Sequence, residues 1–161
     1  MNNQANSPFT VLIVEDAGVL RQLLADLLLF LYPDWKVIEA ENGKRGLHLA
    51  QAIQPDLIIT DFNMPIMNGY EMALELRRNP RTSQIPLLLS SSSDAEHPDL
   101  IQLRPLCQAM LTKPYTLNAL EHTLKNLMAL RSSTAKTPMP YWAATNFPDY
   151  AHPHGHLMLG R

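Results

Sequence analysis

The sequence predicts an α/β protein, with a doubly wound parallel sheet of five strands that helices cover on both faces. Short apolar runs alternate five times with amphipathic stretches along the chain. Each run is apolar at consecutive positions, which is typical of strands buried on both faces. Apolar residues make up 46% of the 161 residues, enough for the core of one globular domain with a segment left over.

The first strand and the first helix have the clearest patterns. Residues 11–14 are Val, Leu, Ile and Val, and they lead directly into two acids, Glu15 and Asp16. Apolar residues then recur at helical spacing until Pro33 breaks the pattern. These residues are Val19, Leu20, Leu23, Leu24, Leu27, Leu28 and Leu31. We therefore expect a strand at 11–14 and a helix that ends before Pro33.

The second and third repeats follow the same order. Residues 35–40 predict a strand, and Asn42-Gly43 predicts the turn into a short helix that ends near Gln54-Pro55. Residues 57–59 predict a buried strand that leads into Thr60-Asp61. The helix expected next, at about 68–78, has Tyr70, Ala73, Leu74 and Arg77 at helical spacing.

The fourth repeat is weaker than the fifth. Residues 86–90 predict a strand, but Pro98 and Pro105 limit any helix within 95–106 to about two turns. Residues 109–112 predict the fifth strand. Thr116 is a candidate N-cap for a last helix ending near residue 131, along which Leu117, Leu120, Leu124 and Leu127 recur.

Polar residues stand where four of these strands end. Parallel crossovers are right-handed, and ligand sites in such sheets lie beyond the carboxyl ends of the strands. Glu15 and Asp16, Asp61, Ser91 and Lys113 occupy those ends. We expect these side chains to converge at one edge of the sheet.

Three carboxylates brought together repel one another unless a cation lies among them. Hard oxygen ligands with no His or Cys nearby favour Mg²⁺. A carboxylate can also attack phosphorus to form an aspartyl phosphate, and a metal and a lysine can stabilise the charge of that transition state. The set of residues therefore suits phosphoryl transfer.

Asp61 is the preferred nucleophile, since it ends an apolar strand and precedes a loop fixed by Pro65 and Gly69. Lys113 precedes Pro114, and a Lys-Pro bond beside a charged site is a candidate cis peptide that would aim the amine. Ser91 offers a hydroxyl to a phosphate oxygen. Taken singly, such residues are more often a helix cap, a turn and a loop serine; together, on the strand ends of one sheet, they favour a functional site.

Three motifs resemble the signatures of response-regulator receiver domains, the chemotaxis-regulator-like family. They are Val11-Leu12-Ile13-Val14-Glu15-Asp16, Asp61-Phe62-Asn63-Met64-Pro65-Ile66-Met67-Asn68-Gly69 and Leu111-Thr112-Lys113-Pro114-Tyr115. The spacing agrees as well, with 45 residues from Asp16 to Asp61 and 52 from Asp61 to Lys113. The resemblance covers about residues 10–131 and implies a flavodoxin-like (βα)5 fold with strand order 2-1-3-4-5.

The resemblance also implies a role for each site residue. Asp61 would accept a phosphoryl group from a histidine kinase or a histidine phosphotransfer protein. Asp16 would bind Mg²⁺ directly with Glu15 close to it, and the backbone carbonyl of Asn63 would complete the protein ligands. Lys113 would contact the phosphoryl group, and Ser91 would be the switch hydroxyl.

Signalling by such a domain passes through its protein contacts. The family's output face for a downstream target is formed by the fourth helix, fifth strand and fifth helix. Catalysis would be limited to Mg²⁺-assisted self-phosphorylation and slow self-dephosphorylation, so the chain is not expected to be an enzyme in the ordinary sense.

The sequence departs from the family pattern around its switch. Met110 stands where the family usually has an aromatic residue, and it has no ring to gate the switch and no phenol to hydrogen-bond. Counting from Pro86 selects Ser91 as the switch residue, whereas a shift of one position would select Ser92. Leu106-Cys107 replaces a small pair before the fifth strand, and two prolines flank the fourth helix.

Two alternatives belong to other functional classes. Met110 favours a constitutive receiver-like scaffold that phosphate does not switch, while the intact acids and Lys113 argue against it. A phosphatase with an aspartyl-phosphate intermediate would carry a second acid two positions after its nucleophile, where this chain has Asn63.

Residues 132–161 are expected to form a separate tail, too short for a DNA-binding domain. The tail contains four prolines and four aromatic residues, Tyr141, Trp142, Phe147 and Tyr150, so it can remain flexible or dock on a partner. His152, His154 and His156 alternate, and we favour solvated side chains over a metal site for them.

Composition and charge argue against several other classes of function. A net charge of −2 gives no reason to expect binding to nucleic acid or a membrane surface. Residues 20–32 are too short to span a bilayer, and the first ten residues lack a signal pattern, so we expect a cytoplasmic protein. The single cysteine, Cys107, is interpreted as a small buried hydrophobe rather than a catalytic thiol.

Overall fold

A computed structural model describes residues 7–92 and 98–133. Five parallel strands form one sheet in the order β2-β1-β3-β4-β5, as the sequence predicts. The three tail histidines, His152, His154 and His156, and the aromatic residues of the tail lie outside the described residues. The predicted fold is therefore confirmed for the described residues.

The expected elements agree closely with the observed ones. The strands are β1 (Thr10–Val14), β2 (Lys36–Ala40), β3 (Leu57–Thr60), β4 (Leu87–Ser91) and β5 (Ala109–Thr112). The helices are α1 (Gly18–Leu31), α2 (Gly43–Ile53), α3 (Gly69–Arg78), α4 (Pro98–Leu103), the 3-10 turn η1 (Arg104–Leu106) and α5 (Leu117–Ser133). The two prolines of the weak segment explain its form, since Pro98 begins α4 and Pro105 lies in the 3-10 turn.

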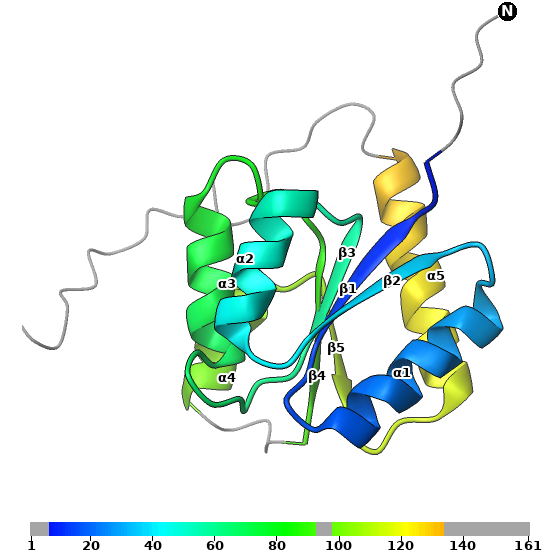
Figure 1. Ribbon diagram of the computed structural model, residues 1–161, viewed down its shortest axis with the longest axis horizontal. Helices are drawn as coiled ribbons and strands as arrows, with labels where there is room; N and C mark the ends of the chain where they lie inside the picture. The colour runs from blue at the N-terminus through cyan, green and yellow to red at the C-terminus, as the bar shows by residue number, and fades with distance from the viewer. Residues whose placement is uncertain (1–6, 93–97, 134–161) are drawn as a thin grey trace, which may run out of the picture.

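The helices cover the sheet in two layers, as Figure 1 shows, with α1 and α5 on one face and α2, α3 and α4 on the other. Successive residues of a strand point to opposite faces, so the strands supply both cores. In β1, for example, Val11 and Ile13 pack in the core beneath α1 and α5, while Leu12 and Val14 pack in the core on the other side. The consecutive apolar runs in the sequence reflect this burial on two faces.

Side-chain caps fix where three helices begin. The Asn42 side chain accepts a hydrogen bond from Arg45 N at 2.8 Å at the start of α2. At α3, Asn68 and Glu71 form a capping box in which each side chain accepts a bond from the other's backbone N–H. The predicted cap of α5 is confirmed, because Thr116 Oγ1 accepts from Ala119 N at 3.1 Å.

The loop between β3 and α3 is folded tightly against the end of β3. A Cβ atom on Gly69 would lie 2.3 Å from the Asp61 carbonyl oxygen, so only glycine fits at this position. Met67 N donates to Pro65 O at 2.8 Å across Ile66, whose φ is 73°. A β-branched residue at positive φ is strained, because its Cβ crowds the backbone. The loop therefore holds Asp61 at the cost of strain at Ile66.

Arg77 is a buried cation on α3, with 6% of its surface exposed. Its guanidinium donates to the carbonyl oxygens of Leu106, Ser83 and Ile85 and to Gln108 Oε1, at 2.8 to 3.2 Å. These acceptors lie just before β4 and at the junction that leads into β5. Arg77 therefore joins the amino ends of two strands to α3.

The thiol of Cys107 packs against the core beside Arg77, which supports its interpretation as a small hydrophobe. Burial raises its pKa to about 12, although the nearby charge of Arg77 acts in the opposite direction. A thiol that stays protonated is a poor nucleophile.

Replacing Arg77 with methionine should lower the free energy of unfolding by about 3 kcal/mol, because several buried acceptors lose their donor. Urea denaturation measures the effect. Arg78→Met is the matched control: Arg78 is exposed and forms a surface ion pair with Glu75, so its loss should cost less than about 0.5 kcal/mol. Equal effects of the two substitutions would contradict the structural role of Arg77.

Replacing Ile66 with asparagine should raise the free energy of unfolding by about 1 kcal/mol, because asparagine tolerates positive φ and Ile66 is exposed. Thermal and urea denaturation measure the change. Ile53→Asn is the control, since Ile53 is also exposed but lies in α2 without a positive φ. A loss of stability in Ile66→Asn would show that the loop is not strained there.

Candidate functional site

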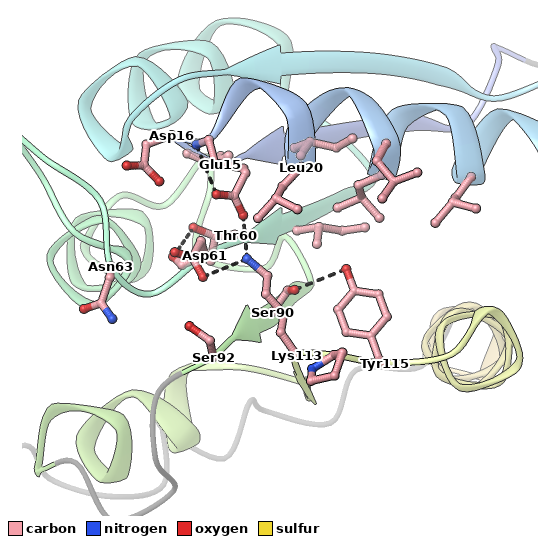
Figure 2. Close-up of a pocket in the computed structure, with 18 residues that line it drawn as sticks. Glu15, Asp16, Leu20, Thr60, Asp61, Asn63, Ser90, Ser92, Lys113 and Tyr115 are labelled. Carbon is pink, nitrogen blue, oxygen red and sulfur yellow. Dashed lines mark hydrogen bonds and ion pairs between the residues drawn. The ribbon is translucent and has the colours of Figure 1, made fainter.

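Four strand ends meet at one cavity of about 660 Å³ at the carboxyl edge of the sheet (Figure 2). Parallel pairing sets the residues side by side: Asp61 N donates to Val14 O, and Lys113 N donates to Ser91 O, both at 2.9 Å. Glu15, Asp16, Asp61 and Lys113 all line the cavity. The structure thus brings together the acids and the lysine that topology predicted.

Three carboxylates form the acidic part of the site. Oxygen atoms of Glu15, Asp16 and Asp61 lie within 4.8 Å of one another. Glu15 and Asp61 are buried, and Asp16 is exposed. This all-oxygen donor set, open to solvent on the Asp16 side, fits a hard divalent cation such as Mg²⁺, which retains several of its waters. Asn63 lines the same cavity from the loop after β3.

Lys113 links the two buried acids. Its Nζ donates to Glu15 Oε2 at 2.6 Å and to Asp61 Oδ1 at 3.2 Å. Partial burial lowers the pKa of Lys113, but the hydrogen bond to Glu15 and the charges of Asp61 and Glu15 outweigh it, so the pKa is raised. Lys113 is therefore a cation throughout the neutral pH range. The Lys113–Pro114 peptide bond, a candidate in the sequence, is cis.

Both oxygens of Glu15 already have partners. Oε1 accepts from Ala17 N at 3.2 Å, and Oε2 accepts from Lys113. Asp16 is less engaged: within residues 7–92 and 98–133, no hydrogen bond or ion pair of its carboxylate is found. Asp16 is thus the acid most available to a cation, in keeping with its expected role.

The serines at the end of β4 alternate between the two faces of the sheet. Ser90 and Ser92 line the cavity, whereas Ser91 is buried and does not. Leu88 packs beneath α1 and α5 and Leu89 on the other side, which places Ser91 on the side of α2, α3 and α4. The serines that line the cavity are therefore Ser90 and Ser92, the residues before and after Ser91 in the chain.

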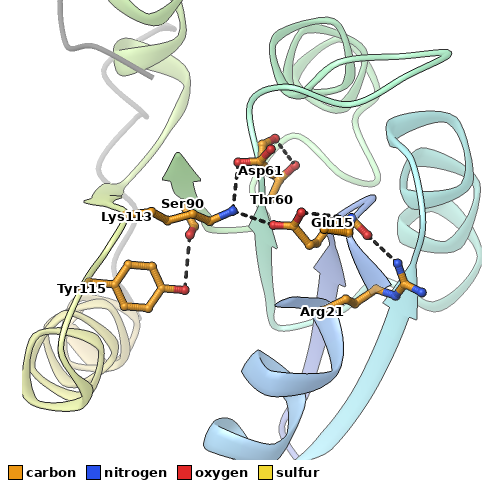
Figure 3. A network of polar contacts seen from close by, with 8 residues as sticks. Glu15, Arg21, Thr60, Asp61, Ser90, Lys113 and Tyr115 are labelled. Carbon is orange, nitrogen blue, oxygen red and sulfur yellow. Dashed lines mark hydrogen bonds and ion pairs between the residues drawn. The ribbon is translucent and has the colours of Figure 1, made fainter. Parts of the chain in front are cut away.

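Two polar contacts beside the site were not anticipated from the sequence. Ser90 Oγ donates to the Tyr115 hydroxyl oxygen at 3.3 Å, and Arg21 Nη1 donates to the Glu15 carbonyl oxygen at 2.6 Å (Figure 3). Strand alternation could have placed Ser90 with Leu88 on the α1 side. Nothing in the pattern of α1 distinguished Arg21 from any surface arginine.

One wall of the cavity is apolar and comes from α1, beside Glu15 (Figure 2). Leu20, Leu23, Leu24 and Leu27 form it. The sequence pattern correctly predicted this helix, but the apolar residues of α1 are not all core residues. Leu23 is 53% exposed and Val19 is 83% exposed. Apolar residues lie on more of the helix surface than the sheet can cover, so some of them face solvent beside the site.

Among the helices within the described residues, none has the length and apolar character needed to cross a membrane.

Comparison with known proteins agrees with this site. The family model described as response regulator receiver domain matches residues 11–125. A segment of histidine kinase P4 of Formosa agariphila is 35% identical over 122 residues, which are 76% of this chain and 9% of the kinase. The nitrate/nitrite response regulator protein NarL of Escherichia coli K12 is 37% identical over 97 residues, 60% of this chain and 44% of NarL. The chain spans less than half the length of these relatives.

Solved structures show the same fold. Chemotaxis protein CheY4 of Vibrio cholerae superposes with a TM-score of 0.66 at 28% identity, covering 74% of this chain and 98% of CheY4. The receiver domain of a histidine kinase from Syntrophus aciditrophicus gives a TM-score of 0.69 at 25% identity, covering 82% and 98% of the two chains. The matched residues include Asp16, Asp61 and Lys113. The chain therefore belongs to the response regulator receiver domain family, the signalling module of two-component phosphorelays.

Proposed function

We propose that Asp61 accepts a phosphoryl group from the phosphohistidine of a histidine kinase or histidine phosphotransfer protein. A carboxylate oxygen of Asp61 attacks phosphorus, the P–N bond breaks, and the released imidazole nitrogen takes up a proton. Hydrolysis of the acyl phosphate later restores the carboxylate. The observation that carries the proposal is the Nζ of Lys113 3.2 Å from Asp61 Oδ1, within the cluster of three acids.

The acids would hold the metal on which this chemistry depends. Asp16 would bind Mg²⁺ directly, with Asp61, the backbone carbonyl of Asn63 and the nearby Glu15 as the remaining protein groups. Bound Mg²⁺ supplies positive charge that stabilises the oxygens of the transferred phosphoryl group. The solvent-open Asp16 and the all-oxygen donor set support this assignment.

Lys113 would stabilise the negative charge of the phosphoryl group once that group is attached to Asp61. Its Nζ already bridges Glu15 and Asp61, and its raised pKa keeps it protonated. When Asp61 carries phosphate, the amine can bond a phosphoryl oxygen in place of the carboxylate while its contact with Glu15 remains. Receiver domains are signalling domains rather than classical enzymes, and we propose no catalysis beyond self-phosphorylation and slow self-dephosphorylation.

We further propose that the signal leaves through the face of α4, β5 and α5. Each of these elements exposes a large apolar side chain, Ile101, Met110 and Leu117 respectively, which supports a protein-binding role. Ser91 would be the switch hydroxyl. Because Ser91 does not line the cavity, this role requires the end of β4 to move once Asp61 is phosphorylated.

The proposed receiver unit spans residues 10–131. Residues 132–161 would form a tail that adds to partner binding. A cytoplasmic location follows from the proposed donors, whose phosphoryl groups derive from cytoplasmic ATP.

Asp61→Asn should abolish phosphorylation, because it removes the nucleophile. Wild type incubated with acetyl phosphate and Mg²⁺ should gain the mass of one phosphoryl group by intact-mass spectrometry, and EDTA should prevent the gain. Asp26→Asn is the control, because Asp26 is an exposed acid on α1 that pairs with Gln22. Equal labelling of wild type and Asp61→Asn would overturn the assignment of Asp61.

Ser91→Ala should abolish the dependence of partner binding on phosphorylation without preventing the phosphorylation of Asp61. Affinity for a partner recovered by pull-down is measured with and without beryllofluoride and Mg²⁺. Ser92→Ala is the control, because Ser92 directly follows Ser91 and lines the cavity, whereas Ser91 does not. If only Ser92→Ala uncouples binding, Ser92 is the switch residue. If beryllofluoride leaves the affinity of wild type unchanged, the constitutive scaffold suggested by Met110 is the better description.

A further inference from the structure

The backbone, rather than a side-chain contact, sets the position of Asp16. Its carboxylate is exposed and has no hydrogen bond or ion pair to the residues that the structure describes. The peptide group that joins Glu15 to Asp16 is therefore the nearest point at which the protein can hold this acid. Whatever fixes that peptide also fixes the direction from which Asp16 approaches a cation.

Arg21 holds this peptide from α1. Its Nη1 donates to the Glu15 carbonyl oxygen at 2.6 Å, a contact that Figure 3 shows. On the other side of the same residue, Glu15 N donates to Ala40 O at 3.1 Å, which ties it to the end of β2. The backbone of Glu15 is thus held on both sides: Ala40 accepts from its N–H, and Arg21 donates to the carbonyl of the Glu15–Asp16 peptide.

Glu39 in turn holds Arg21. Arg21 Nε lies 3.2 Å from Glu39 Oε2, and 21% of the Arg21 side chain is exposed. A guanidinium presents several donors in one rigid plane, so it can bond the Glu15 carbonyl and the Glu39 carboxylate at once. Lysine has a single charged nitrogen and cannot reproduce both contacts with the same geometry.

Arg21 forms its ion pair with Glu39 rather than with the acids of the site. Within the described part of the chain, Glu39 is the carboxylate with which Arg21 forms an ion pair, and Arg21 makes none with Glu15, Asp16 or Asp61. Arg21 therefore does not compete with a cation for the carboxylates of the site. Arg21 acts on the loop through a neutral carbonyl and forms no hydrogen bond with the carboxylate oxygens of Glu15, Asp16 or Asp61.

We propose that Arg21, oriented by Glu39, is a positioning residue that sets the affinity of the acidic site for Mg²⁺ by fixing the Glu15–Asp16 peptide. The inference rests on the proposed function, because it assumes that Asp16 binds the metal. Groups that orient metal ligands typically change metal affinity by 10- to 100-fold when they are removed. Arg21 makes no contact with Asp61 or Lys113, so the rate of phosphoryl transfer at saturating Mg²⁺ should not depend on it.

The test measures Mg²⁺ affinity directly, by isothermal titration calorimetry on the full chain without a phosphodonor. Arg21→Gln should weaken Mg²⁺ binding about tenfold. The Mg²⁺ affinity of Arg21→Lys should lie between those of Arg21→Gln and wild type, since lysine retains the positive charge but only part of the hydrogen-bond geometry. Arg78→Gln is the control, because it removes another Arg–Glu pair, the one with Glu75 on α3. The control should bind Mg²⁺ as wild type does.

A kinetic measurement separates positioning from general loss of structure. With acetyl phosphate, Arg21→Gln should require about tenfold more Mg²⁺ for half-maximal phosphorylation and reach the wild-type rate at saturation. A lower rate at every Mg²⁺ concentration would overturn the inference in favour of a purely structural role. Should Arg21→Gln fail to fold, Glu39→Gln is the second variant. It retains the hydrogen bond from Arg21 to the Glu15 carbonyl but removes the carboxylate that orients Arg21, so it should also weaken Mg²⁺ binding.

The outcomes distinguish this inference from the function on which it rests. If wild type binds no Mg²⁺, the proposed metal site itself is wrong. If wild type binds Mg²⁺ and both Arg21→Gln and Glu39→Gln bind it equally well, the metal site remains and the role of Arg21 is wrong.

Discussion

The contact of Lys113 with Glu15 and Asp61 is the interaction on which the site depends. It joins residues from the ends of three strands, β1, β3 and β5, across the width of the sheet. Two buried carboxylates side by side repel each other unless a cation lies between them. Lys113 bonds both acids and offsets part of their charge, which lets the two carboxylates lie close together.

Strand topology explains why so much of the site could be predicted from sequence. The residue that follows each buried strand of a parallel sheet must lie at the carboxyl edge, so Asp61 and Lys113 could be placed without knowing any distance. The fold could be predicted from the strands as well, because a run of consecutive apolar residues indicates a strand that is buried on both faces of the sheet. Gly69 and Thr116 likewise occupy positions where only particular residue types fit or cap.

What could not be predicted depends on side chains that meet from distant elements. Arg21 contacts Glu15 and Glu39, and Arg77 contacts carbonyl groups before β4 and β5. No periodic pattern in the sequence indicates either set of contacts. The exposure of Val19 had a similar cause: helical spacing identifies a helix, but how much of its apolar surface is covered depends on the neighbouring elements. Assigning the switch serine also required the face of β4 on which each hydroxyl lies.

The hydrogen bonds of Arg77 have a mechanical consequence. They pin β4 and β5 at their amino ends, while the phosphoryl chemistry proposed above acts at their carboxyl ends, beside Ser91 and Lys113. When two paired strands are held at one end, the displacement of their residues is smallest at that end and increases toward the other. We therefore expect any displacement caused at the site to be largest near Ser91 and Thr112 and smallest near the hydrogen bonds of Arg77.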